Sequence, residues 1–176
     1  MEIDFSNLTS EKITDFHCLE TFYSGVEAMD KFIQSDFRMS VENHYCSAYG
    51  VWYKEELETG ISSTGTPNVD WNYKETFYAK PRYPALDIAY LAVREEYRGN
   101  KVGQSIVELI ADRARSQTFA GCQFLTVEAL ATSEYSAVGF YQRCGFTANE
   151  VRKPYKDTLR MFRTLYANEE EFVGDE

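Results

Sequence analysis

The chain has 176 residues, a formal net charge of −10 and 44% hydrophobic residues. That hydrophobic fraction is enough for one core, and the composition excludes an intrinsically disordered protein. Half of the net charge comes from the five acids in residues 168–176, so we expect one domain over 1–167 followed by an acidic, mobile tail. The acidic balance also argues against a large nucleic-acid-binding surface, because phosphate contacts need clustered Lys and Arg.

The sequence predicts a cytoplasmic protein without a membrane partner or a metal site. No basic N-terminal segment precedes an apolar run, and no apolar run approaches the ~20 residues that a membrane-spanning helix needs. The cysteines form no CxxC pair and have no His at zinc-ligand spacing. We therefore expect reduced thiols. The four cysteines are Cys18, Cys46, Cys122 and Cys144.

The N-terminal half gives the weaker structural pattern. Apolar residues recur at three- and four-residue steps through 24–45, which predicts a helix. Residues 45–53 are rich in strand-forming residues. A further short strand is expected near 59–63, followed by a long surface loop over 63–84 that is rich in turn residues.

From residue 85 onward, strands and helices alternate more clearly. The predicted elements are a strand over 86–93, a helix over 101–118, a strand over 122–127, a helix over 134–144 with Ser133 as its N-cap and Gly145 as its stop, a strand from 146 and a last strand over 158–166. This order predicts an α/β layered fold with a mixed sheet.

The junction between the strand at 86–93 and the next helix is the most informative part of the sequence. Amides at a helix N-terminus have no partner inside the helix, and the helix dipole favours an anion there. Gly99 and Gly103 would let the backbone approach a bulky group such as a pyrophosphate, and Arg98 and Lys101 add positive charge. An ordinary strand-to-helix turn fits the same spacing, so the local pattern leaves both interpretations open.

Two segments resemble the signatures of the GNAT superfamily of N-acetyltransferases. Leu-Ala-Val at 91–93, followed by Tyr-Arg-Gly-Asn-Lys-Val-Gly at 97–103, resembles the acetyl-CoA segment, whose pattern is Arg/Gln-x-x-Gly-x-Gly/Ala. Phe-Tyr-Gln-Arg-Cys-Gly-Phe at 140–146 resembles the second signature, and the order and separation of the two segments also match. The resemblance implies a mixed, mostly antiparallel sheet with flanking helices and a V-shaped splay between the central strands.

The resemblance further implies direct transfer of an acetyl group from acetyl-CoA to a primary amine, with no metal and no acyl-enzyme. Strand amides would hold the pantetheine arm and the thioester, and loop amides would hold the pyrophosphate. Tyr141 matches the family tyrosine that protonates the departing thiolate, although a tyrosine on a core-facing helix can also be a packing residue. The implied cofactor-binding residues are Leu91, Ala92, Val93, Arg98, Gly99, Asn100, Lys101, Val102, Gly103 and Gln104.

The general base is less well defined. Glu128 follows the strand at 122–127 and is the first candidate, with a solvated strand-end acid as the alternative interpretation. Asp87 would instead anchor a neighbouring loop, and a water chain could also take the proton. Catalysis by a cysteine thiol ranks below direct transfer, because only His17 and His44 could activate it and neither lies in a recognisable motif.

Lys101 departs from the family pattern, which has its first glycine at this position. A non-glycine residue with positive φ is unfavourable, so we expect Lys101 to have a negative φ. Acetyl-CoA affinity would then depend on whether the Lys side chain near the phosphates compensates for the lost glycine.

The N-terminal segment at 22–33 resembles the opening of a GNAT subgroup, and so does Lys-Pro-Arg-Tyr-Pro at 80–84. That subgroup includes toxins of toxin–antitoxin pairs that acetylate charged transfer RNA. Ser24 replaces the subgroup cysteine, and the acidic charge departs from the basic surface of those toxins. The resemblance places the acceptor side of the fold within 20–45 and 55–84.

Three functions therefore stay open for the chain. The first is acetylation of an amine on a small molecule or a protein. The second is acetylation of aminoacyl-tRNA, which the acidic charge disfavours. The third is a catalytically degenerate module that only binds acyl-CoA. The resemblance also leaves open a homodimer, which is common in the family, and an antitoxin partner.

Overall fold

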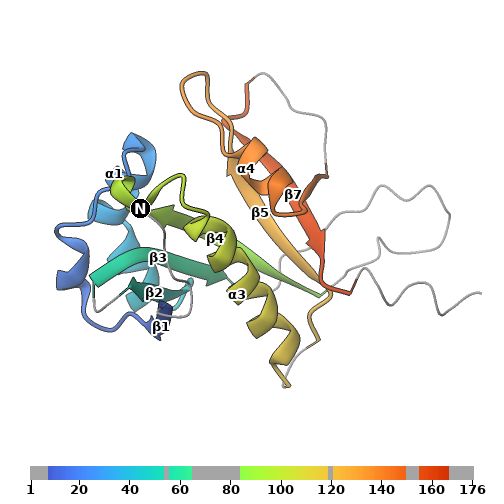
Figure 1. The fold of residues 1–176 in the computed structure, drawn as a ribbon, viewed down its shortest axis with the longest axis horizontal. Helices are drawn as coiled ribbons and strands as arrows, with labels where there is room; N and C mark the ends of the chain where they lie inside the picture. Colours follow the sequence, from blue (N-terminus) through green and yellow to red (C-terminus); the bar gives the residue numbers. More distant parts are fainter. Residues whose placement is uncertain (1–7, 54–55, 65–83, 119–120, 150–154, 167–176) are drawn as a thin grey trace, which may run out of the picture. The chain divides into compact units, whose positions relative to one another are not determined.

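The computed structural model describes residues 8–53, 56–64, 84–118, 121–149 and 155–166. The chain divides into two compact units, the first formed by 1–65 and 88–110 and the second by 66–87 and 111–176. Figure 1 shows the elements coloured along the sequence. The acidic tail at 168–176 and nearly all of the loop predicted at 63–84 lie outside the described residues.

The sheet of the first unit contains four strands in sequence order. Only the C-terminal part of the fourth strand, from Ile88 onward, belongs to this unit. The four strands are β1 (Leu8–Lys12), β2 (Ser47–Tyr53), β3 (Glu56–Thr64) and β4 (Ala85–Val93), in that order. Strand β2 pairs antiparallel with β1, where Val51 lies opposite Ser10, and antiparallel with β3. The sequence analysis missed β1, because this five-residue edge strand is polar and largely exposed.

The helix predicted over 24–45 is in fact two helices, α1 (Glu27–Ser35) and α2 (Phe37–Glu42). Both follow a short 3-10 helix, η2 (Phe16–Leu19). The break at Asp36 lets Phe37 turn into the core, where it is 3% exposed and meets the rings of Phe16 and Phe32 edge-on at 6.1 and 6.0 Å. The buried core of this region comprises Ile13, Leu19, Phe22, Phe37, Ala48 and Ala92.

Helix α3 (Val102–Ser116) follows β4 and the 3-10 helix η3 (Glu95–Tyr97). Its buried side chains recur at three- and four-residue steps, as expected of an amphipathic helix. They are Val102, Ile106, Val107, Ile110, Ala111 and Ala114. The first turn holds no acid, and the last turn holds Arg113 and Arg115, which complement the negative end of the helix dipole. The positive end of α3 is therefore not neutralised by its own side chains.

The second unit contains the strand order β5 (Phe124–Leu130), β7 (Thr158–Thr164), β6 (Thr147–Ala148), with β7 antiparallel to both neighbours. Helix α4 (Val138–Arg143) lies over β5 in Figure 1 and contacts it. The side chains from Phe124 to Val127 are all buried, so both faces of this strand are covered there.

Helix α4 begins later than the sequence predicts. Ser133 is not its N-cap, because a turn occupies this stretch, in which Thr132 and Tyr135 exchange hydrogen bonds and Ala131 pairs with Ser136. The helix starts at Val138, and the C-terminal stop at Gly145 is confirmed by its φ of +82°.

The predicted α/β layered fold, with strands that pair antiparallel and helices against them, is confirmed. The V-shaped splay between the central strands, which the resemblance implies, stays a prediction. Within the described ranges, no helix is long and apolar enough to cross a membrane.

Candidate active site

The loop between η3 and α3 has two residues in the left-handed region of backbone conformation. Gly99 has a φ of +81° and Lys101 a φ of +63°. The expectation of a negative φ at Lys101 is therefore wrong. The loop keeps the conformation that a glycine would favour, because the buried residues on either side, Tyr97 at 8% and Val102 at 1% exposure, fix where it starts and ends.

This loop leaves the N-terminus of α3 open. The first hydrogen bond of the helix is donated by the amide of Ser105 to the carbonyl of Lys101 at 3.1 Å. The amides of residues 102–104 come before it in the chain and therefore have no partner within the helix. The Asn100 side chain donates to the carbonyls of Tyr97 and Arg98 and braces the loop from inside. Among the residues that the structure describes, a Cβ added to Gly99 would meet nothing within 4 Å. The loop therefore has the donors, the dipole and the space that a phosphate group needs.

The strain at Lys101 gives a first prediction. Left-handed backbone costs a non-glycine residue ~1–2 kcal/mol, of which the flexibility of glycine in the unfolded chain offsets roughly half. Lys101→Gly should therefore raise the free energy of unfolding by about 0.5–1 kcal/mol, as measured by urea denaturation. Lys101→Ala removes the same charge and keeps the strain, so an equal gain in both variants would contradict this explanation.

Three further predicted cofactor-binding residues lie on β4. Leu91, Ala92 and Val93 form its C-terminal end, and Ala92 is buried in the core of the first unit. Arg98 is exposed, and its guanidinium Nη1 donates to the carbonyl of Ser24 at 3.1 Å. The structure thus brings Arg98 to the segment that precedes α1, a contact that sequence reasoning did not predict.

The position of Tyr141 is set by the C-terminal end of α4. The amide of Phe146 donates to the carbonyl of Tyr141 at 3.0 Å, and the amide of Gly145 donates to that of Gln142 at 3.0 Å. This is a Schellman motif, in which the residue after the left-handed glycine contacts the last helical turn. The Phe146 ring accordingly lies edge-on to the Tyr141 ring at 5.4 Å. The signature at 140–146 is therefore the local structure that fixes Tyr141.

The Tyr141 side chain is buried, with 5% of its surface exposed. Burial raises the pKa of its phenol above the usual value, and the nearby Cys144, Tyr135 and Asp87 raise it further. The phenol consequently stays protonated at neutral pH, as a general acid must. Tyr141 lies in the second unit and the loop before α3 in the first.

Glu128 already has partners on the neighbouring strand. Its carboxylate accepts a hydrogen bond from Thr158 Oγ1 at 2.9 Å and forms ion pairs with Lys156 at 3.3 Å and Arg160 at 3.6 Å. The side chain is 40% exposed. These two cations stabilise the ionised carboxylate, so they make it a weaker acceptor for the proton of an amine.

Asp87 joins a more deeply buried network that the sequence analysis missed. Arg160 Nη1 lies 3.1 Å from Asp87 Oδ1, and the fully buried Thr126 donates to the same oxygen at 2.6 Å. Arg160 Nη2 donates in turn to Thr126 Oγ1 at 3.0 Å. Asp87 therefore ties strands together rather than a loop. In the sequence of β7, Arg160 lies between the apolar Leu159 and Met161, which are buried. This alternation could have placed Arg160 on the opposite face of the strand from those two residues.

The cysteines show no arrangement for nucleophilic catalysis or metal binding. None of the four is in a disulfide bond, and Cys122 and Cys144 are buried. Burial raises the pKa of the Cys122 thiol, which makes it a poorer nucleophile. Among the residues that the structure describes, no group of His, Cys, Asp and Glu could hold a metal ion.

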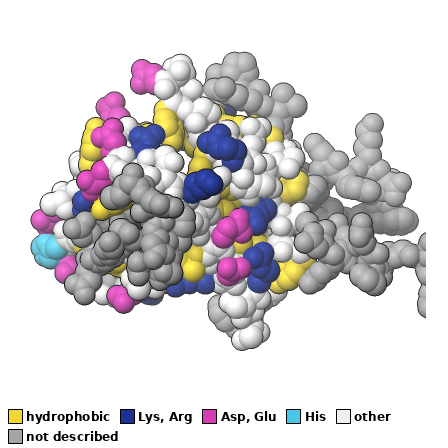
Figure 2. All heavy atoms as spheres, in the orientation of Figure 1, with side chains coloured by type: hydrophobic (Ala, Val, Ile, Leu, Met, Phe, Trp, Pro, Cys, Tyr) yellow, Lys and Arg dark blue, Asp and Glu magenta, His cyan; other side chains and the backbone are white. Residues whose placement is uncertain are grey.

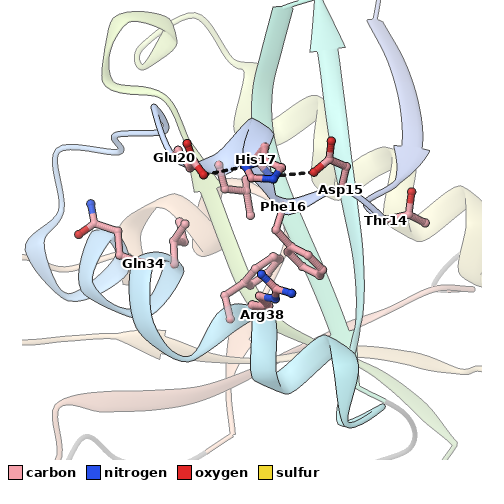
Figure 3. Close-up of a pocket in the computed structure, with 10 residues that line it drawn as sticks. Thr14, Asp15, Phe16, His17, Glu20, Gln34 and Arg38 are labelled. Atoms are coloured by element: carbon pink, nitrogen blue, oxygen red, sulfur yellow. Dashed lines mark hydrogen bonds and ion pairs between the residues drawn. The ribbon is translucent and has the colours of Figure 1, made fainter.

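The first unit also has an open pocket of about 430 Å³ between η2 and the helices α1 and α2 (Figure 3). Its apolar wall comprises Phe16, Leu19, Ile33 and Phe37. At its rim, Asp15 and Glu20 lie on either side of His17, whose Nδ1 is 2.8 Å from the Glu20 carboxylate. This hydrogen bond raises the pKa of His17. The pocket partly falls within residues 20–45, on the acceptor side expected from the sequence.

Comparison with known proteins identifies a family. The family model described as the acetyltransferase (GNAT) family matches residues 19–146. None of the curated proteins matches the chain.

Solved structures of similar fold include a toxin bound to part of its antitoxin. A Tyr-to-Phe mutant of the toxin AtaT, bound to the C-terminus of the antitoxin AtaR and acetyl-CoA, is 20% identical with a TM-score of 0.64, covering 96% of this chain and 99% of that chain. A Tyr-to-Phe mutant of KacT is 18% identical with a TM-score of 0.67, covering 94% and 99%. The KacTA–DNA complex is 20% identical with a TM-score of 0.61, covering 96% and 99%. At these identities the likeness shows the fold alone.

Proposed function

The chain belongs to the GNAT family of acetyltransferases, and we propose that it transfers the acetyl group of acetyl-CoA directly to a primary amine. The observation that carries this proposal is the open loop before α3. Two left-handed residues form this loop, the amides of the first helical turn have no partner within the helix, and no acid in that turn competes with an anion for them. This arrangement suits the pyrophosphate of coenzyme A.

Each part of the donor has a proposed binding element. The amides of residues 99–104 hold the pyrophosphate, with Arg98 and Lys101 supplying positive charge. The backbone of Leu91, Ala92 and Val93 holds the pantetheine arm and the thioester carbonyl. Amides that donate to this carbonyl stabilise the negative charge that develops on its oxygen when the amine attacks.

The chemical step needs an acid for the leaving sulfur. The amine nitrogen attacks the thioester carbon, the carbon–sulfur bond breaks, and the sulfur takes the proton of the Tyr141 hydroxyl. Solvent then returns a proton to Tyr141. The proton of the amine leaves to a base, for which Glu128 and water are the two candidates. The ion pairs of Glu128 with Lys156 and Arg160 favour water.

The first experiment is calorimetric titration of the purified chain with acetyl-CoA, followed by an assay of coenzyme A thiol release with a panel of amines. We expect binding in the micromolar range and thiol release that requires one class of amine. Failure to bind acetyl-CoA would refute the proposal. Binding without thiol release from any amine or charged transfer RNA would instead favour the degenerate binding module.

Aminoacyl-tRNA is the second candidate acceptor. The observation that favours it is the likeness to the toxin AtaT over nearly the whole chain, together with the motif at 22–33. The charge argues against it, since the chain carries −10 overall. On the face drawn in Figure 2, basic and acidic side chains of the described residues are interspersed.

Mass spectrometry of charged transfer RNA after incubation with the chain and acetyl-CoA decides between the two acceptors. An N-acetylated aminoacyl group, binding that weakens steeply with salt, and growth arrest on expression would together assign the toxin activity. Acetylation of a free amine with no change in charged transfer RNA would exclude it.

A further inference from the structure

The motif at 22–33, which the proposed chemistry does not use, forms a hydrogen-bonded turn before α1. The amide of Ser24 donates to Oδ1 of Asp30 at 2.7 Å, and both residues are buried. The amide of Val26 donates to Ser24 Oγ at 3.2 Å. Gly25 between them has a φ of +74°, which explains why the motif has glycine there.

This turn is attached to the segment 94–98 by three hydrogen bonds. Arg94 Nη2 donates to Thr21 Oγ1 at 3.3 Å, the amide of Glu95 donates to the carbonyl of Tyr23 at 3.1 Å, and Arg98 donates to the carbonyl of Ser24. We call residues 21–26 and 94–98 together the latch. Both halves belong to the first unit.

Any side chain at Gly25 would be strained by the positive φ, and it would also crowd two side chains of the latch. A Cβ there would come within 2.9 Å of Glu95 Oε1 and 3.1 Å of Arg98 Nη1. Phe22 at the start of the turn is 2% exposed, and the Arg94 guanidinium lies over its ring at 5.9 Å. The two halves therefore fit closely, with a buried anchor on one side and the guanidinium groups of Arg94 and Arg98 on the other.

The second half of the latch leads directly into the loop before α3. The amide of Arg98 closes η3 on the carbonyl of Glu95 at 3.1 Å, and Gly99 follows it. We infer that the latch positions the acetyl-CoA loop, so that Asp30 acts on cofactor binding through Ser24 and Arg98. This inference rests on the proposed function, because it takes residues 99–104 as the pyrophosphate site.

Asp30 is the best point at which to test the latch. It lies outside the cofactor loop, and its Oδ1 accepts the bond that orders the turn. Without that acceptor, the buried Ser24 amide would have no partner, so the turn and the Arg98 contact would loosen. Asn at this position keeps a carbonyl oxygen for the same bond. Glu27 lies exposed at the start of the same helix, so Glu27→Ala is a matched control.

The experiment compares wild type, Asp30→Ala, Asp30→Asn and Glu27→Ala by acetyl-CoA titration and by hydrogen exchange of the free protein. We expect Asp30→Ala to raise the Kd for acetyl-CoA about tenfold and to speed exchange of amides 99–105, with the other two variants within about twofold of wild type. Unchanged affinity and exchange in Asp30→Ala would overturn the inference. Equal losses in Asp30→Asn and Asp30→Ala would also overturn it.

Two further measurements distinguish failure of the latch inference from failure of the proposed function and from misfolding of a variant. Wild type that does not bind acetyl-CoA would refute the proposed function itself. If Asp30→Ala does not fold, Arg98→Met replaces it, because Met lacks the donor to the Ser24 carbonyl. Faster exchange at 99–105 in the free Arg98→Met protein then supports the latch, and unchanged exchange overturns it.

Discussion

Tyr141→Phe should lower kcat for acetyl transfer by about 10²–10³, with little change in the Kd for acetyl-CoA. The substitution removes only the hydroxyl that protonates the departing thiolate. The ring keeps its edge-on contacts with Phe140 at 4.9 Å and Phe146 at 5.4 Å, so the helix end stays intact. Steady-state kinetics and a titration of each protein with acetyl-CoA measure the two effects separately.

Tyr155→Phe is the matched control for this substitution, because Tyr155 is 83% exposed and the same hydroxyl is lost. It should leave kcat unchanged. A Tyr141→Phe protein that retains most of its kcat would show that Tyr141 is only a packing residue. A loss shared by kcat and thermal stability would indicate the same, since the effect would then come from the fold.

The pH dependence of kcat in the wild type is a second test of Tyr141 as the general acid. A raised pKa means that the phenol keeps its proton to higher pH than an ordinary tyrosine, whose pKa is near 10.0. The acid form therefore persists throughout the neutral and mildly alkaline range. We expect kcat to show no decline from pH 8 to about 10 in wild type. A decline with an apparent pKa below 9 would contradict the assignment of Tyr141 as the acid.

The sequence predicts best what short-range contacts determine. The stop of α4 at Gly145 could be predicted, because a left-handed glycine followed by an apolar residue is a local pattern. The strand β5 could be predicted because Phe-Leu-Thr-Val at 124–127 is a local run of strand-forming residues. The start of α4 could not, because Ser133 is a good N-cap in isolation, while hydrogen bonds between Thr132 and Tyr135 use that stretch for a turn.

Packing and pairing beyond the local pattern account for two other misses. Lys101 has a positive φ because the packing of Tyr97 and Val102 overrides its own preference. Asp87 and Arg160 are far apart in sequence, and only the sheet brings their charges to 3.1 Å. The fold therefore holds Lys101 in the left-handed conformation that suits the glycine of the family pattern, although the residue is not glycine.

Gly103→Glu should abolish acetyl-CoA binding, with a Kd raised by at least about 100-fold, while the protein becomes no less stable. The new carboxylate would stand in the first turn of α3, which has no acid, and would repel the pyrophosphate from the amides of 102–104. For the helix itself, the change is favourable, because Glu replaces Gly and an acid at the N-terminal turn complements the dipole. Gly121→Glu is the control with the same added charge, because Gly121 is exposed and a Cβ there would lie 3.9 Å from Pro84. Calorimetric titration together with thermal denaturation separates the outcomes. Loss of binding at unchanged or higher stability places the donor at the α3 N-terminus, and full binding by Gly103→Glu would place it elsewhere.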